Sequence, residues 1–248
     1  MSGIKYELKK QGFVVPLLCV ILPLLINLVI ATSLSTRYEG YLLPHKAGFG
    51  LTNWQLIFKE QTILYFSEIL YIVAAVLVYN LYKIELKDNA WTMVASTEYR
   101  NNKVILNKFA TTMFDVLIYL IVNYICLLFI GCIQLNVGPI ETGMIIKAFG
   151  IQFISCMFIV AFYFLVISFF RKIKSVLVVG TVMAILDISL YYKDNPGIAL
   201  KLPITFISQC YKATMSSMGY ISVVGVCLTI LCLLGGVVIF RNKYNIEE

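Results

Sequence analysis

Three acidic residues, Glu68, Asp115 and Asp187, lie in or beside long apolar stretches of this 248-residue sequence. A charge at membrane depth costs several kcal/mol unless it is paired or faces water, so such residues mark ion pathways, proton relays or substrate routes. Glu68 and Asp187 both fall in the half of their stretch that we expect to be the outer one. A cavity wall that opens outward would explain the two together, and a private hydrogen-bond partner would explain each separately.

Asp115 has a different sequence context, just before its apolar stretch begins. It shares a predicted helical face with Lys108, Thr111 and Thr112, because positions three, four and seven residues apart lie on one side of a helix. We interpret this face as a helix that extends into the cytoplasm. In that interpretation Lys108 and Asp115 are in contact with water.

Most catalytic constellations have no counterpart in the sequence. Without a GxxxxGK[ST] motif, we do not expect the chain to bind ATP phosphates, and it has no GxSxG nucleophile motif. Its single histidine, His45, lies in a predicted outer loop, which argues against an intramembrane metalloprotease or a histidine-dependent acyltransferase. No Cys/His spacing indicates zinc. We therefore expect no catalytic, cofactor or metal site in this chain. The remaining interpretation is a transporter whose energy comes from an ion gradient or another subunit.

The composition predicts an integral membrane protein. Apolar residues make up 60% of the chain and charged residues 13%, whereas soluble domains have about half and a quarter. One helical crossing of a bilayer core ~30 Å thick needs roughly 20 apolar residues. The connecting segments are too short to fold alone, so we predict one all-α transmembrane domain over residues 1–248 with six spans. The six windows are 13–33, 62–82, 116–133, 148–170, 175–192 and 221–240.

The distribution of basic residues predicts the orientation. Lysine and arginine concentrate on cytoplasmic segments. With the amino terminus inside, 13 of the 20 lie on inner segments and seven on outer ones. We therefore predict a multi-pass protein of the plasma membrane with both termini cytoplasmic. The net charge of +7 then reflects topology and attraction to lipid, and we expect no nucleic-acid partner.

The first window could also be a signal peptide, because Lys5, Lys9 and Lys10 precede it. Its apolar run is too long for a signal peptide and no small-x-small cleavage site follows, so we expect a retained span. Residues 2–12 also have apolar positions four apart. This spacing favours a short helix on the inner membrane surface, with an unstructured basic anchor as the alternative.

Two outer segments have helical signals of their own. Leu51, Trp54, Ile57 and Phe58 recur at helical spacing, and tryptophan is typical of the headgroup zone, so we expect an interfacial helix there. Residues 193–218 contain turn signals and interrupting prolines. We expect them to form short helices that dip into the outer leaflet, which requires their backbone to be buried in protein. Without a GxxxG motif, close helix contact would come from scattered small residues.

The inner segment 83–108 is the most informative loop. It mixes acidic and basic residues around Trp91, and Ser96 or Thr97 is suited to cap a helix that begins at Glu98. A short amphipathic helix there would suit the docking of a cytoplasmic partner. A solvated connector is an equally good interpretation of these residues alone.

Taken together, these segments resemble the permease subunits of type-2 ABC exporters, most closely those of lantibiotic self-immunity and peptide-toxin export in Gram-positive bacteria. ELKKQGFVVPLLCVILPLL (7–25) is similar to that family's elbow helix and first span, and TNWQLIF (52–58) to the segment before its second span. IELKDNAWTMVASTEYRNNKVILNKF (84–109) resembles its coupling segment, and residues 196–218 its outer-leaflet helices. The resemblance covers the whole chain through pattern rather than through one strict motif.

The resemblance implies that the coupling segment docks on a separately encoded ABC ATPase dimer, which binds ATP and Mg. Two permeases, identical or homologous, would form the pathway. From their place in the outer half of the membrane, we further expect Glu68 and Asp187 to line that pathway and attract a cationic peptide from the outer leaflet. We therefore expect export of an amphipathic or hydrophobic peptide, such as a lantibiotic or another bacteriocin, in immunity, toxin secretion or antibiotic resistance. The docking residues would be Glu85, Asp88, Trp91, Thr97, Glu98 and Arg100.

Two alternatives remain open at the level of sequence. One is a gradient-driven secondary transporter or channel, with Glu68 and Asp187 as ion or proton sites. The other is a membrane scaffold that assembles other subunits without transport.

Overall fold

The computed structural model describes residues 3–87, 101–170, 172, 174–191, 203–208, 210–212 and 215–244. In these ranges the regular elements are all helical. The α-helices are α1 (Gly3–Gln11), α2 (Val14–Arg37), α3 (Lys46–Phe49), α4 (Asn53–Ile63), α5 (Ile69–Lys87), α7 (Asn101–Phe129), α8 (Thr142–Phe170), α9 (Lys174–Tyr191) and α11 (Met215–Tyr244). The π-helical turns η1 (Tyr38–Leu42) and η2 (Ile130–Gln134) extend α2 and α7. The 3-10 turns η3 (Pro203–Thr205) and η4 (Cys210–Lys212) precede α11.

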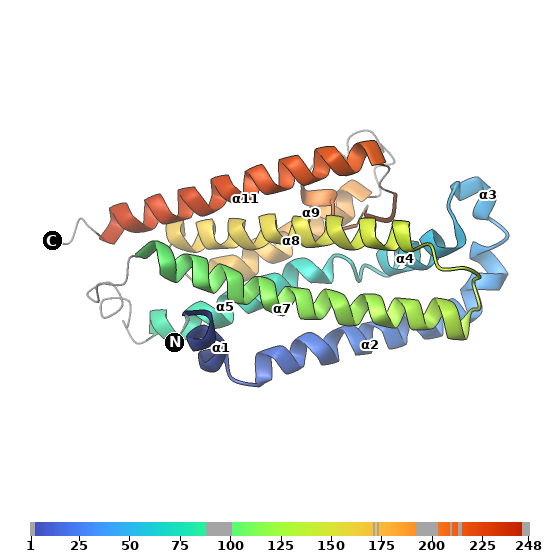
Figure 1. Cartoon of the computed structure of the whole chain (residues 1–248), viewed down its shortest axis with the longest axis horizontal. Helices are drawn as coiled ribbons and strands as arrows, with labels where there is room; N and C mark the ends of the chain where they lie inside the picture. Colours follow the sequence, from blue (N-terminus) through green and yellow to red (C-terminus); the bar gives the residue numbers. More distant parts are fainter. Residues whose placement is uncertain are drawn as a thin grey trace.

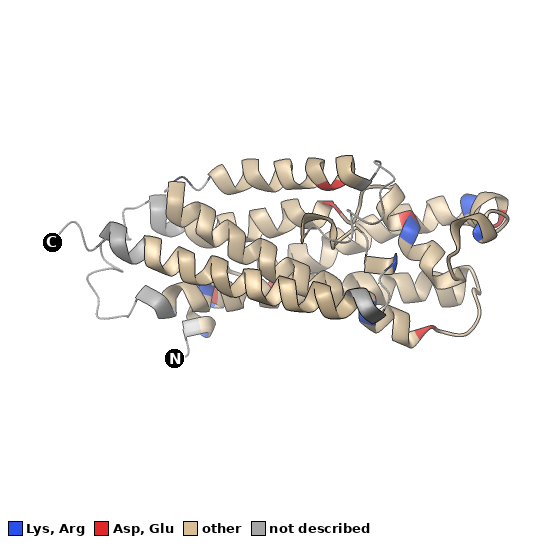
Figure 2. Cartoon of the chain, turned by 90° about the horizontal axis from the view of Figure 1, so that it is seen from above, with Lys and Arg blue, Asp and Glu red and all other residues tan. Residues whose placement is uncertain are grey.

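Four helical stretches of the described chain are long and apolar enough to cross a membrane, and α5 adds a shorter apolar helix over Ile69–Lys83. Most of the helical length carries neither Lys or Arg nor Asp or Glu (Figure 2). The described fold is thus all-helical and consistent with a transmembrane protein. That the chain crosses the membrane six times remains a prediction. The four long stretches are Val14–Leu42, Val104–Gln134, Thr142–Phe170 and Met218–Ile239.

The long helices lie side by side in an elongated bundle (Figure 1). Helix α8 is central and packs on α11, α7, α5 and α9, while α2 packs on α7 and α5 on α9. Helix α1 packs on α7 at one end of the bundle. Helix α11 ends there too, and so do the C-terminal end of α5 and the first turn of α7, whereas α3 lies at the opposite end (Figure 1).

Scattered small residues allow the closest helix contacts, as the sequence predicts. A Cβ atom on Gly180 of α9 would lie 2.7 Å from the Cβ of Ala75 in α5. On Gly225 of α11 it would lie 2.6 Å from Cγ2 of Ile154 in α8. Neither separation is possible for real side-chain atoms, so α9 and α11 approach their neighbours at positions where only glycine fits.

The predicted span 62–82 is not one helix, which corrects the sequence interpretation. Helix α4 ends within the window, because the Phe66 N–H donates to the Gln61 carbonyl (2.9 Å) and the Tyr65 N–H to the Thr62 carbonyl (3.0 Å). This pair of bonds is a Schellman motif. Tyr65 has the left-handed conformation (φ 58°) that glycine usually supplies there. Helix α5 therefore starts at Ile69, directly after Glu68.

Helix α4 confirms the helix expected around Trp54, but its apolar side chains are covered by protein. Thr52 caps it with a reciprocal capping box to Gln55. Trp54, Leu56 and Phe58 are all buried, and the Trp54 indole N–H donates to the Pro139 carbonyl (2.8 Å). Apolar positions surround most of this helix, so it packs inside the bundle rather than exposing one face.

Candidate functional site

Glu68 lies at the start of α5, where it is 2% exposed. Its backbone carbonyl accepts the Tyr71 N–H (3.1 Å), and its side-chain Oε2 accepts a hydrogen bond from the Ser67 hydroxyl (3.0 Å). The amino-terminal end of a helix favours negative charge because its first N–H groups are unpaired within the helix. The break between α4 and α5 therefore places a carboxyl group at the positive end of α5, inside the bundle.

Asp187 belongs to α9 and is fully buried. Its Oδ1 accepts a hydrogen bond from the Ser208 hydroxyl (2.7 Å). Ser208 lies between η3 and η4, in the stretch 203–212 that leads to α11. One partner of each acid is therefore a serine: a chain neighbour for Glu68 and a distant residue for Asp187.

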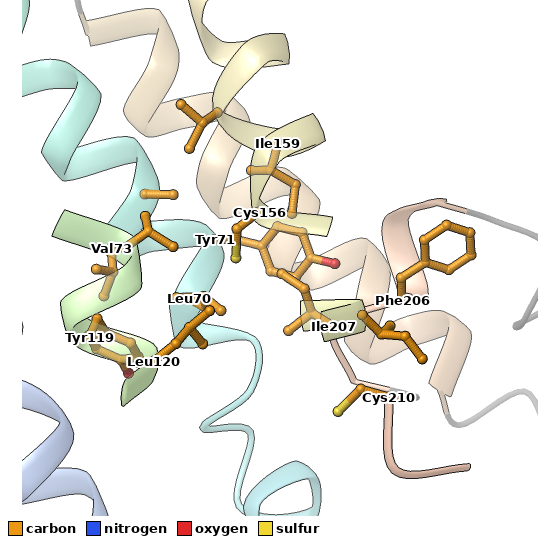
Figure 3. Close-up of a cluster of buried hydrophobic side chains, with 14 of the residues drawn as sticks. Leu70, Tyr71, Val73, Tyr119, Leu120, Cys156, Ile159, Phe206, Ile207 and Cys210 are labelled. Atoms are coloured by element: carbon orange, nitrogen blue, oxygen red, sulfur yellow. The ribbon is translucent and has the colours of Figure 1, made fainter. Parts of the chain in front are cut away.

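The stretch 203–212, of which all but residue 209 is described, enters the bundle, and its described residues form no α-helix. Its residues Phe206, Ile207 and Cys210 are buried among α5 and α8 side chains such as Tyr71 and Cys156 (Figure 3). Side chains of other helices donate to its backbone carbonyls, which is the condition for non-helical backbone in a membrane-buried position. The donor and acceptor pairs are Tyr71 with Ile204, Gln152 with Ile207 (3.4 Å), Thr62 with Ser208 (3.2 Å) and Gln55 with Tyr211 (2.8 Å).

A chain of polar contacts links Glu68 to Asp187 through Ser67, Thr62 and Ser208. The Tyr71 hydroxyl lies beside Asp187. The Ser67 hydroxyl is also within 3.3 Å of the Thr62 hydroxyl, which in turn donates to the Ser208 carbonyl. The private hydrogen-bond partners considered from the sequence therefore occur, and the cavity wall that opens outward stays a prediction. We call Thr62, Ser67, Glu68, Asp187 and Ser208 the carboxyl cluster.

A second polar group corrects the interpretation of Lys108 and Asp115 as water-exposed. Both side chains are fully buried. Lys108 Nζ lies 3.0 Å from Glu7 Oε2 of α1 and donates to the Leu81 carbonyl (3.4 Å). The Gln11 amide donates to Asp115 Oδ2 (3.0 Å). Helix α1 supplies these partners from about one hundred positions earlier, so no local pattern around Asp115 could show them.

A third polar group joins α2, α4 and α7 and has no counterpart in our sequence predictions. Asn123 Oδ1 accepts hydrogen bonds from the amides of Asn27 (2.8 Å) and Gln61 (2.9 Å). All three side chains are buried. The available signal was an amide inside each of two apolar windows, where a polar group needs a partner on another helix.

The predicted docking residues fall at the edge of the described chain. Glu85 belongs to α5. Asp88, Trp91, Thr97, Glu98 and Arg100 lie outside the described residues, between the end of α5 at Lys87 and the start of α7 at Asn101.

Among the residues that the structure describes, no three His, Cys, Asp or Glu side chains gather as a metal site would require. The carboxyl cluster is thus a pair of acids among hydroxyl groups and backbone carbonyls. No protein-family model matches the chain, and no curated protein matches it.

Proposed function

We propose that the chain is the permease subunit of an ATP-driven ABC exporter that moves amphipathic or hydrophobic peptides, such as lantibiotics or peptide toxins, out of the cytoplasmic membrane. Long apolar helices and the resemblance of the elbow, coupling and outer segments to that family support the proposal. The motor would be a separate ATPase dimer that binds ATP and Mg, and a second permease would complete the pathway.

The observation that carries the proposal is the contact among α1, α5 and α7 near the helix ends that flank residues 88–100. Lys108 of α7 is buried against Glu7 of α1 and the Leu81 carbonyl of α5. Three helices are therefore tied together at the end of the bundle where α11 also finishes (Figure 1). A partner that docks on this segment can move α5 and α7 as one unit.

In this proposal Glu85, Asp88 and Trp91 form the first half of the ATPase-docking surface, and Thr97, Glu98 and Arg100 form the second. Closure of the ATPase on ATP would move the docking segment, and α5 would transmit that motion to Glu68 at its opposite end. The peptide would leave along a pathway that includes Glu68 and Asp187. Both termini would face the cytoplasm.

Site-specific photo-crosslinking tests the docking surface. A benzophenone amino acid at position 91 should form a crosslink, in native membranes, to a chain whose peptides contain GxxxxGK[ST]. The same label at Tyr41, which is 45% exposed in η1 just before α3, is the control and should not form it. Trp91→Ala should reduce co-purified ATPase activity. A crosslink from position 41 with none from position 91 would invert the proposed topology.

Reconstitution then tests the activity. Vesicles that contain the chain and the crosslinked ATPase should move a fluorescent cationic amphipathic peptide only when MgATP is present on the ATPase side. Peptide or ion movement by the purified chain alone, driven by a gradient, would instead support a secondary transporter or channel. The observation that favours that second candidate is the burial of Glu68 beside Asp187.

A further inference from the structure

The carboxyl cluster contains more acceptor oxygens than donors. Glu68 Oε1 and Asp187 Oδ2 have no hydrogen-bond partner, although their residues are 2% and 0% exposed. The serine hydroxyl groups satisfy only the other oxygen of each acid, through Ser67 and Ser208. Each of the two buried carboxyl groups therefore has one oxygen atom without a hydrogen bond.

An independent side chain adds to this surplus. Gln152 of α8 is 3% exposed and donates through its amide nitrogen to the Ile207 carbonyl, next to Ser208. Its Oε1 has no hydrogen-bond partner. A buried amide oxygen that lacks a donor needs an explanation, and a bound water or ion is one. The unsatisfied oxygens thus come from the α5 start, α9 and α8, around one stretch of chain.

The other titratable groups that face the acids cannot neutralise them. These groups are Tyr71 of α5 and Cys210 of η4, and neither side chain carries a positive charge. Like charges at short range cannot both remain ionised without a compensating positive charge. Burying them in an apolar surrounding makes the penalty larger.

The backbone around the acids provides further oxygen and dipole groups. The Schellman turn at Tyr65 ends α4 and brings the Thr62 and Ser67 hydroxyl groups beside Glu68. The stretch 203–212 carries Ser208 to Asp187. Carboxylate, hydroxyl and carbonyl oxygens are the ligands that hard cations prefer. Broken helices whose ends meet inside a membrane bundle are suited to hold small ions.

We propose that the carboxyl cluster binds one monovalent cation, H⁺ or Na⁺, between Glu68 and Asp187. The cation neutralises one of the two acids and bridges the start of α5 to the stretch 203–212 through Ser208. Its binding therefore holds that stretch in place. This site does not depend on the docking of an ATPase, and it would exist in a permease and in a secondary transporter alike.

Thermal unfolding of the purified full chain in lipid nanodiscs tests the Na⁺ source. NaCl is varied against choline chloride at constant ionic strength, and the wild type is compared with Glu68→Gln and Asp187→Asn. A Na⁺ site predicts a Tm that rises and saturates with Na⁺ in the wild type and stays flat in both variants. The matched control is Glu39→Gln, which removes an exposed carboxyl group of η1 and should keep the full response.

Infrared spectroscopy tests the H⁺ source. A protonated carboxyl group gives a C=O stretching band that a carboxylate lacks. An H⁺ site predicts such a band at neutral pH, lost at alkaline pH, shifted by ¹³C-labelled aspartate or glutamate, and absent from Glu68→Gln or Asp187→Asn. Isotope labelling assigns the band to aspartate or glutamate, and its loss from Glu68→Gln or Asp187→Asn assigns it to the cluster, since Glu7, Glu60 and Asp115 are also buried.

Hydrogen exchange of the stretch 203–212 tests the bridge. Removal of the cation, by choline replacement or alkaline pH according to the source, should speed amide exchange there in the wild type, and Ser208→Ala should do the same. The proposal is overturned if the wild type shows neither a saturating Na⁺ response nor a protonated carboxyl band at neutral pH. A loss of ATPase crosslinking with either cation signal intact would count against the exporter alone.

Discussion

Lys108 Nζ and Glu7 Oε2 lie 3.0 Å apart, and neither residue is more than 5% exposed. The pair joins α1 to α7 across about one hundred positions of sequence. Tyr82 contributes to the same site, because the lysine ammonium lies 5.3 Å from the centre of its ring. A segment that would otherwise be an amphipathic surface helix thus becomes part of the bundle.

The first prediction concerns this ion pair. Glu7→Gln should destabilise the chain by about 3–5 kcal/mol, because it removes the negative charge that lies 3.0 Å from the buried Lys108 ammonium. Combining it with Lys108→Met should restore much of that loss, since both charges are then gone. Thermal unfolding of the two variants measures the effect. Lys5→Met, which removes an exposed lysine of the same helix, is the control and should change little. Equal Tm values for Glu7→Gln and the wild type would contradict the role assigned to the pair.

The second prediction concerns the close approach of α9 to α5. Gly180→Ala should cost about 1–3 kcal/mol, because its Cβ would meet the Cβ of Ala75, which has no side-chain torsion through which to move away. Guanidinium or thermal unfolding in detergent measures the loss. Gly219→Ala in α11 is the matched control, since nothing lies within 4 Å of its Cβ position. A stability for Gly180→Ala as high as for the control would mean that the helices separate freely.

The third prediction concerns the turn that ends α4. Replacing Tyr65 removes its ring in any variant, so the comparison is between replacements. Asn tolerates the left-handed backbone better than Ala does, and Tyr65→Asn should be more stable than Tyr65→Ala by roughly 1 kcal/mol. Tyr65→Gly should also exceed Tyr65→Ala. Unfolding curves of the three variants give the order, and an Ala variant at the top of that order would contradict the turn geometry.

The fourth prediction concerns Lys59 of α4. Partial burial, and then the positive charge of Lys212, lower the pKa of Lys59 from 10.5 to about 8. In the unfolded chain the amine keeps its ordinary pKa, so between about pH 8 and pH 10.5 the folded chain binds fewer protons and its stability rises with pH. Competitive acylation should therefore titrate the Lys59 amine with a midpoint near pH 8.

The control for that experiment is Lys212→Gln. Removing the neighbouring positive charge should move the Lys59 midpoint upward, toward the value of an ordinary lysine. A Lys59 midpoint that is already ordinary in the wild type would rule out the contact with Lys212 and the burial that accompany it.

The sequence predicts the helical class well because long apolar runs have few alternatives to helix in a membrane. It also selects Glu68 and Asp187, because an acid in such a run needs an explanation wherever the run folds. The turn at Tyr65 could not be foreseen, since no glycine or proline marks it and tyrosine rarely adopts its conformation. Likewise the burial of Lys108 depends on Glu7, a residue whose own surroundings predict a surface position.

The buried stretch before α11 has a consequence for how the chain is made. The side chains of other helices that donate to its carbonyls in the described structure, from Gln55 to Gln152, emerge from the ribosome before the stretch itself. The helices that carry these donor side chains must therefore already be inserted and packed when residues 203–212 are synthesised. Helix α11 is the next helix to be synthesised, so a translational delay just before it would give the stretch time to pack among the earlier helices.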